Sequence, residues 1–88
     1  MIKPVLFSSG EILATPGALG LGVDLMPYLF RHLTGDWGDL DAVDRQQNEQ
    51  AVKDGSRIMS AYETPAGKLW IVSEADRSAT TLLLPDEY

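Results

Sequence analysis

Few side chains in this sequence are suited to catalysis. The chain has no cysteine and a single histidine, His32. Nucleophilic catalysis needs a nucleophile beside a base that a third group orients. No Gly-x-Ser-x-Gly elbow accompanies His32, which follows Arg31 on a predicted helix and faces away from its apolar side. We therefore expect a partly exposed histidine near a helix C-terminus, and we predict that the protein is not an enzyme.

Binding motifs for phosphate and metal are also missing from the sequence. A phosphate-binding loop would read Gly-x-x-x-x-Gly-Lys-Ser/Thr, and no such run occurs. The glycines of residues 17–22 lack the βαβ context of a dinucleotide fold and disfavour a helix, so we interpret this stretch as a flexible connection. The acids between residues 36 and 44 do not have the spacing of an EF-hand. The sequence predicts no cofactor and no metal site.

Carboxylates concentrate in residues 35–54. Six acidic residues against Arg45 and Lys53 give this segment a net charge of −4, most of the chain's −6. Trp37 stands among these acids. A large aromatic side chain with a rim of carboxylates is typical of a docking site for a basic protein partner. The alternative is that Trp37 closes the loop over the core. We predict a protein-binding site made of Asp36, Trp37, Asp39, Asp41 and Asp44.

The overall charge narrows the possible partners. Thirteen acidic against seven basic residues disfavour direct binding to nucleic acid, whose phosphates would repel the chain. An inhibitor that imitates nucleic acid remains an alternative, as does a homodimer formed through an exposed strand. No apolar run reaches the roughly 18 to 20 residues that span a bilayer, and the N-terminal residues lack the apolar core of a signal peptide. We expect a cytoplasmic protein that does not bind membranes.

Two short helices are predicted. The first covers residues 25–34, with Asp24 as its cap and Gly35 at the left-handed position after its end. Residues at i, i+3, i+4 and i+7 spacing give it one apolar face: Met26, Leu29, Phe30 and Leu33. The second covers residues 42–54, from a cap at Asp41 to Gly55. Its apolar stripe is narrow, so we expect it on the surface.

From residue 56 onward the apolar pattern changes to a period of two. Three strands within residues 56–84, joined by short turns, predict an antiparallel meander. Residues 5–14 contain short extended pieces that add a possible fourth strand. Trp70 alternates with its neighbours and is expected on the second sheet face or at a dimer contact. The predicted core consists of Leu29, Phe30, Leu33, Ile58, Leu69, Ile71 and Leu83.

These elements predict a single α+β domain over residues 1–88. It should contain an antiparallel sheet of three to four strands, with two short helices packed on one face. A domain of this size buries only about 60 to 65% of its unfolded surface, so self-association would help to support the fold.

Several stretches carry a resemblance to a known family. They are residues 14–19 (ATPGAL), 35–40 (GDWGDL), 70–78 (WIVSEADRS) and 83–88 (LLPDEY). In these the chain resembles a group of small bacterial proteins, described as hypothetical or plasmid-related, from plasmids and integrated mobile elements. Some members are labelled as methylase subunits of type I restriction systems, but this chain has neither a Gly-rich cofactor loop nor an Asn-Pro-Pro-Tyr motif. The resemblance therefore implies a genomic setting, with a partner in host DNA metabolism or defence, and no site residues.

Overall fold

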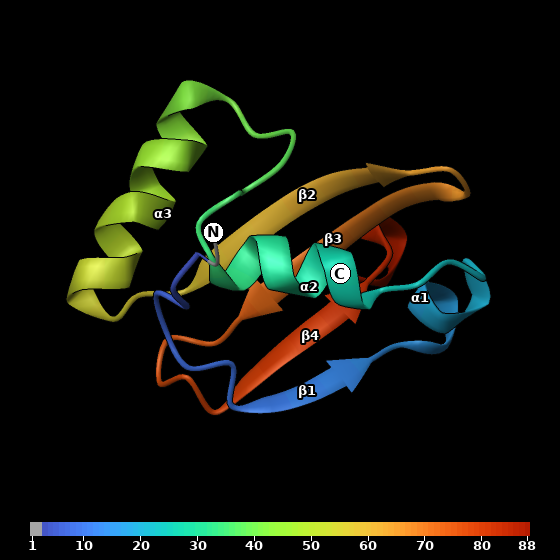
Figure 1. Cartoon of the computed structure of the whole chain (residues 1–88), viewed down its shortest axis with the longest axis horizontal. Coiled ribbons are helices and arrows are strands. Elements are labelled where there is room, and N and C mark those ends of the chain that lie inside the picture. Colours follow the sequence, from blue (N-terminus) through green and yellow to red (C-terminus); the bar gives the residue numbers. More distant parts are fainter. Residues whose placement is uncertain (1–2) are drawn as a thin grey trace.

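The computed structural model describes residues 3–88, and Figure 1 shows them as one sheet with helices around it. The strands are β1 (Glu11–Ala14), β2 (Ile58–Thr64), β3 (Gly67–Ser73) and β4 (Ala79–Leu83). The helices are α1 (Pro16–Gly20), α2 (Met26–Leu33) and α3 (Ala42–Asp54), followed by the single 3-10 turn η1 (Pro85–Glu87). The predicted α+β class is confirmed.

The sheet has the strand order β1-β4-β3-β2. The predicted meander is present, since β2 pairs with β3 and β3 pairs with β4, both antiparallel. β1 supplies the fourth strand but pairs with β4 in parallel. The sheet is therefore mixed rather than purely antiparallel. A period of two reports that a strand forms, whereas its direction depends on where the chain returns to the sheet.

One face of the sheet carries the main core. Alternate side chains of a strand point to the same face, and α2 lies across one face of the sheet (Figure 1). The contact of 2.6 Å between His32 of α2 and the Ser60 hydroxyl shows that this face receives the even-numbered residues of β2. The buried residues packed together there come from α1, α2 and the three strands of the meander: Ala18, Leu29, Tyr62, Leu69, Ile71 and Leu82. This cluster fixes α2 on the sheet.

The helix ends agree closely with the sequence prediction. The Asp41 carboxylate accepts a hydrogen bond of 2.8 Å from the backbone N–H of Asp44 at the start of α3. Gly55 follows α3 with a φ of 77°, and Gly35 lies beyond α2 with a φ of 92°. At the start of α2 the N-cap is Leu25 rather than the predicted Asp24, although the Asp24 carboxylate accepts a hydrogen bond of 3.1 Å from the N–H of Met26. These local signals are strong because each satisfies backbone groups that a helix end leaves unpaired.

The buried face of α2 is rotated relative to the predicted one. Phe30 and Met26 are 49% and 63% exposed, whereas His32 is fully buried. The predictions of a buried Phe30 and a partly exposed His32 are therefore wrong. The sheet opposite α2 presents hydroxyl groups that bind the imidazole, and this favours turning His32 inward. The other predicted core residues are buried or partly buried: Leu29, Leu33, Ile58, Leu69, Ile71 and Leu83.

The glycine-rich stretch forms the short helix α1, where a flexible connection was expected. The Thr15 hydroxyl caps it by accepting a hydrogen bond from the N–H of Ala18 at 3.1 Å, and Pro16 occupies its first turn. The Glu87 carboxylate accepts hydrogen bonds from the Thr15 hydroxyl (2.6 Å) and the Gly17 N–H (3.2 Å). A side chain about 70 positions away thus stabilises a helix that propensity alone disfavours.

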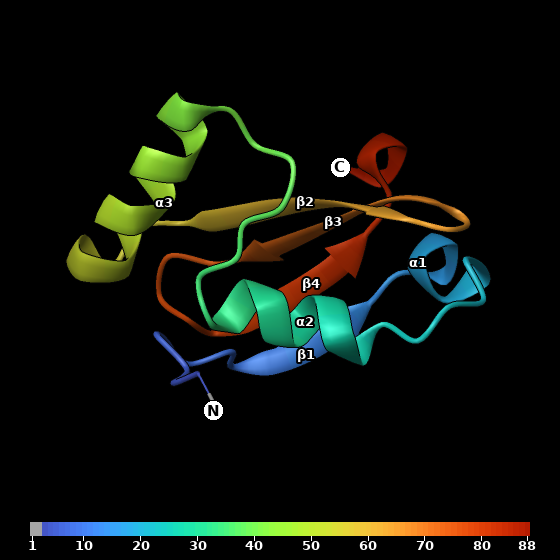
Figure 2. The ribbon, with the colours of Figure 1, turned by 45° about the horizontal axis from the view of Figure 1, so that its top comes forward.

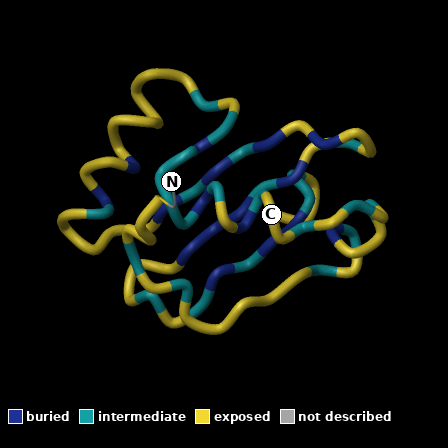
Figure 3. The backbone as a smooth tube through the Cα atoms, in the orientation of Figure 1, coloured by how far each residue is buried: buried dark blue, intermediate teal, exposed yellow. Residues whose placement is uncertain are grey.

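The two edges of the sheet differ. Along β2, the Asn48 side chain of α3 bonds both the C=O (2.7 Å) and the N–H (3.3 Å) of Met59. Next to it, Ala61 bonds the backbones of Asp39 (2.7 Å) and Trp37 (3.1 Å). α3 and the segment before it therefore cover the β2 edge. All four residues of β1 are exposed, as the yellow trace of Figure 3 shows.

Candidate binding groove on the open face of the sheet

The second face of the sheet is covered mainly by the C-terminal residues. Figure 2 shows η1 and α2 on opposite sides of the sheet. The Tyr88 ring packs edge-on against Trp70, with 5.6 Å between centroids, and the Arg57 guanidinium lies 5.0 Å from the centre of the Tyr88 ring. Trp70 is paired across the ladder with Ala61 of β2, so both side chains belong to this face.

A groove of about 310 Å³ opens on this face beside the β2 edge. Its floor consists of strand residues on the second face, Met59, Ala61 and Trp70, all half-buried. One wall comes from the segment before α3 and the first turn of α3, which contribute Asp39, Leu40 and Asp44. Tyr62, Glu63 and Lys68 complete the lining. The groove thus combines an apolar floor with an acidic wall.

A close backbone contact brings the acidic wall to the sheet. Gly38 has a φ of 74° and forms a parallel bridge with Ala61. A Cβ at Gly38 would clash with the backbone oxygen of Ala61. Glycine is the residue that tolerates both this conformation and this approach. Asp39 and Leu40 follow at once, so the bridge places them over the open face.

The carboxylates of Asp39 and Asp44 are available to a ligand. Both residues are exposed, and within residues 3–88 neither side chain accepts a hydrogen bond or joins an ion pair. Glu63 and Lys68, also exposed, form an ion pair at 3.8 Å. The remaining charge of the groove is therefore negative and attracts a cation.

Trp37 lies outside this groove and is buried. It is 4% exposed and packs in a second cluster with Ala51 and Ile58. Its indole Nε1 donates a hydrogen bond to Glu49 of α3 at 3.1 Å, and its ring stacks on that of Phe7 with centroids 6.4 Å apart. The prediction of Trp37 as an exposed anchor is therefore wrong, because burial between α3 and the N-terminal segment satisfies both its apolar ring and its N–H.

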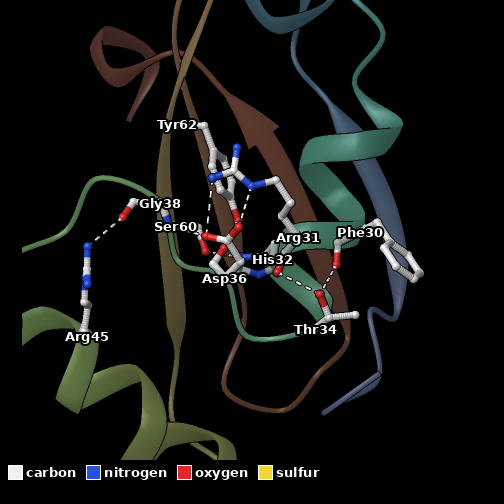
Figure 4. A network of polar contacts seen from close by, with 9 residues as sticks. All are labelled: Phe30, Arg31, His32, Thr34, Asp36, Gly38, Arg45, Ser60 and Tyr62. Carbon is white, nitrogen blue, oxygen red and sulfur yellow. Dashed lines mark hydrogen bonds and ion pairs between the residues drawn. The ribbon is translucent and has the colours of Figure 1, made fainter. Parts of the chain in front are cut away.

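Asp36 and Asp41 have structural contacts. Asp36 accepts hydrogen bonds from Arg31 at 2.7 and 3.3 Å and from the N–H of Gly38 at 3.2 Å (Figure 4). The Arg31 guanidinium holds the pKa of the Asp36 carboxyl below its usual range. The Tyr62 hydroxyl donates to the Asp36 carbonyl at 2.6 Å. Asp41 caps α3. The five predicted residues therefore do not form one site, and of these Asp39 and Asp44 line the groove.

A directed chain of hydrogen bonds runs through the core. His32 Nδ1 lies 2.6 Å from the Ser60 hydroxyl, and Nε2 lies 2.9 Å from that of Ser73. Ser73 bonds Thr80 at 2.7 Å, and Thr80 donates to the Ser9 carbonyl at 2.7 Å. Because the Thr80 hydroxyl donates its one proton to the Ser9 carbonyl, it must accept from Ser73. Ser73 then accepts from Nε2–H, which makes Nδ1 the acceptor from Ser60.

This chain of hydroxyls does not form an active site. His32, Ser60, Ser73 and Thr80 are all fully buried, so no substrate reaches them. Burial, with the positive charge of Arg77 nearby, lowers the pKa of His32 to about 3. The imidazole is thus neutral near pH 7. It links α2 to β2 and β3 as a buried polar bridge.

Two further kinds of feature are absent from residues 3–88. No three His, Asp or Glu side chains gather in a way that could hold a metal ion. None of the helices in this range has both the length and the apolar character needed to cross a membrane.

Sequence reasoning missed Trp70 and Met59 as site residues. Their signal is the alternation in the hairpin, because Leu69 and Ile71 face the core and must leave Trp70 on the other side. No pattern in the sequence indicates that the loop before α3 folds over that side.

Comparison with known proteins adds no relative. No family model matches the chain, and no curated protein or solved structure does either. The resemblance to plasmid-related proteins therefore stays a prediction from the sequence.

Proposed function

We propose that this protein is a non-enzymatic binding domain whose groove holds a basic segment of a partner protein. The observation that carries the proposal is the juxtaposition of a half-buried Trp70 with the unengaged carboxylates of Asp39 and Asp44. An aromatic floor provides apolar contact area, and a charged rim provides specificity and a faster association.

The partner is best matched by an extended segment that carries lysine or arginine next to an apolar residue. The apolar residue would contact Met59 and Trp70, and the cation would face Asp39 and Asp44. A guanidinium or ammonium also packs favourably on an indole ring. A cytoplasmic location and a mobile-element setting remain parts of this proposal, as the sequence led us to expect.

The test selects peptides from a random library displayed on phage, with the full chain as bait. We expect the selected peptides to be enriched in lysine and arginine beside a bulky apolar residue. A synthetic copy of the best peptide then serves as the probe. Its binding should lower the fluorescence or shift the NMR signal of the Trp70 indole, and it should weaken as salt is raised, because exposed charges are screened beyond about 8 to 10 Å.

Two matched double variants distinguish binding in the groove from attraction to the overall negative charge of the protein. Asp39→Asn with Asp44→Asn removes two charges from the groove, and exposed pairs of about 0.2 to 1 kcal/mol each predict a roughly 2- to 30-fold weaker affinity. Asp41→Asn with Asp54→Asn removes two charges at the two ends of α3, outside the groove lining, and keeps both side-chain oxygens that accept hydrogen bonds. This control should bind as the wild type does. Equal affinities for both double variants, or selected peptides without basic residues, would overturn the proposal.

A further inference from the structure

The groove beside β2 continues toward the start of that strand. A second hollow of about 180 Å³ shares three lining residues with the groove, Leu40, Asp44 and Met59. The far end of this hollow is lined by Tyr88 and by Arg57, which directly precedes β2. We call it the Arg57 hollow. A segment bound in the groove can therefore extend along β2 as far as Arg57.

The Arg57 guanidinium has a packing partner but no anionic partner. It lies 5.0 Å from the centre of the Tyr88 ring, within the range of a cation–π contact. Within residues 3–88 the exposed Arg57 side chain joins no ion pair. Stacking uses the flat face of a guanidinium, whereas its N–H donors lie in its plane. These donors therefore remain available to a carboxylate, which a guanidinium binds with two parallel hydrogen bonds.

Two carboxylates of the protein are close to Arg57 but belong to a different hollow. Glu74 and Glu87 line a third hollow of about 420 Å³, which has only Arg57 and Tyr88 in common with the Arg57 hollow. The Glu87 carboxylate already accepts three hydrogen bonds at the starts of α1 and η1. Arg57 and Tyr88 thus separate these acids from the groove, and the charge that Arg57 presents to the groove is positive.

We propose that the basic segment held in the groove also carries an acidic residue, whose carboxylate pairs with Arg57. This inference rests on the proposed function and identifies a second feature of the same partner. Unengaged acids, Asp39 and Asp44, lie toward one end of the groove and the unpaired Arg57 lies at the other, so the complementary segment has a cation at one end and an anion at the other. The net charge of −6 repels an acid at any other position of the segment.

The sheet sets the spacing between the two charges of the partner. The N–H of Asp39 bonds the carbonyl of Ala61, which is four positions beyond Arg57 along β2. An extended chain rises about 3.3 Å per residue, so the two ends are about 13 Å apart. An extended segment lying along β2 covers this length with four residues, and an even spacing turns both side chains to the same face. We therefore expect the acid four positions from the lysine or arginine.

Selection from the displayed peptide library tests this pairing. With the wild type as bait, the peptides should carry Asp or Glu four positions from the selected Lys or Arg. With Arg57→Glu as bait, the acid should be replaced by Lys or Arg at that position, because the charge facing it is reversed. The first basic position should stay as it is, since Asp39 and Asp44 are unchanged.

Affinity measurements with two synthetic peptides complete the test. One is the best wild-type peptide, and the other has its acid replaced by the corresponding amide. The wild type should bind the amide peptide about 2- to 5-fold more weakly, as expected for an exposed ion pair. Arg57→Gln should bind both peptides equally. Comparison of the two peptides within one variant removes any effect of the substitution on Tyr88. Lys68→Gln, which removes another exposed cation of the groove lining, should keep the difference.

The outcomes distinguish this inference from the proposed function. Basic peptides that lack the acid, equal affinities of the wild type for the two peptides, or an unchanged acid preference with Arg57→Glu as bait would overturn the inference and leave the proposed function standing. A wild-type bait that selects no basic residue would overturn the proposed function, and the inference with it.

Discussion

Acidification from pH 7 to pH 5 is expected to destabilise the protein through His32. The imidazole has an ordinary pKa near 6.5 in the unfolded chain and a pKa of about 3 in the folded one. The folded state therefore keeps the imidazole neutral between pH 7 and pH 5. Its contribution is fully present above pH 6.5 and is lost as the pH falls toward 3, because only the unfolded chain takes up the proton in that interval.

The size of the effect follows from the two pKa values. Linkage between them gives a loss of about 2 kcal/mol at pH 5 relative to pH 7, and of about 3 kcal/mol at pH 4. Asp36, Asp76 and Glu87 have a lowered pKa and also contribute, but their stabilisation is lost only as the pH falls through and below their usual range near 4. The interval from pH 7 to pH 5 therefore isolates His32, the one histidine of the chain.

Urea denaturation at pH 5, 6 and 7 measures this loss, with His32→Gln as the control. Glutamine keeps a donor and an acceptor but does not titrate. The variant should therefore be less stable than the wild type at pH 7, and its own free energy of unfolding should not change between pH 7 and pH 5. NMR titration of the wild-type imidazole should show no protonation above pH 5. A His32 that titrates near pH 6.5, or a wild-type midpoint that does not change between pH 7 and pH 5, would refute the reasoning.

Two further predictions concern packing and backbone geometry. Ile71→Ala should lower the free energy of unfolding by about 2 to 5 kcal/mol, because Ile71 is fully buried, whereas Phe30→Ala on the exposed side of α2 should change it by clearly less; urea midpoints compare the two. Gly55→Ala should cost about 1 to 2 kcal/mol because an L-residue is strained at its positive φ. Gly38→Ala should cost more, since its Cβ would also clash with Ala61, and similar thermal midpoints for the two variants would contradict this contrast.

Local signals in the sequence determined the ends of α2 and α3 and the three strands of the meander. Asp41 and Gly55 mark α3 because capping and a left-handed terminal residue are properties of a few adjacent residues. The alternation around Leu69 and Ile71 likewise reports a strand with one buried face, since the period of two is intrinsic to extended backbone. No partner from elsewhere in the chain is needed to read these features.

The candidate site depended on contacts between distant residues. Asp39 and Asp44 were predicted as site residues from their acidity, but what gives them an apolar neighbour is Trp70, about 30 positions away. The bridge between Gly38 and Ala61 brings the acidic segment next to Trp70, because Ala61 pairs with Trp70 in the sheet. Nothing in the local pattern at Gly38 specifies which strand it will approach.

Burial of the polar and aromatic residues was decided by the tertiary structure alone. The period of α2 is the same whether Phe30 or His32 turns inward, and the choice falls to His32 because Ser60 and Ser73 of the sheet can pair both of its nitrogens. Trp37 is buried because Glu49 and the N-terminal segment meet its N–H and its ring. A buried polar group is tolerated only when partners complete its hydrogen bonds, and those partners are brought together by folding.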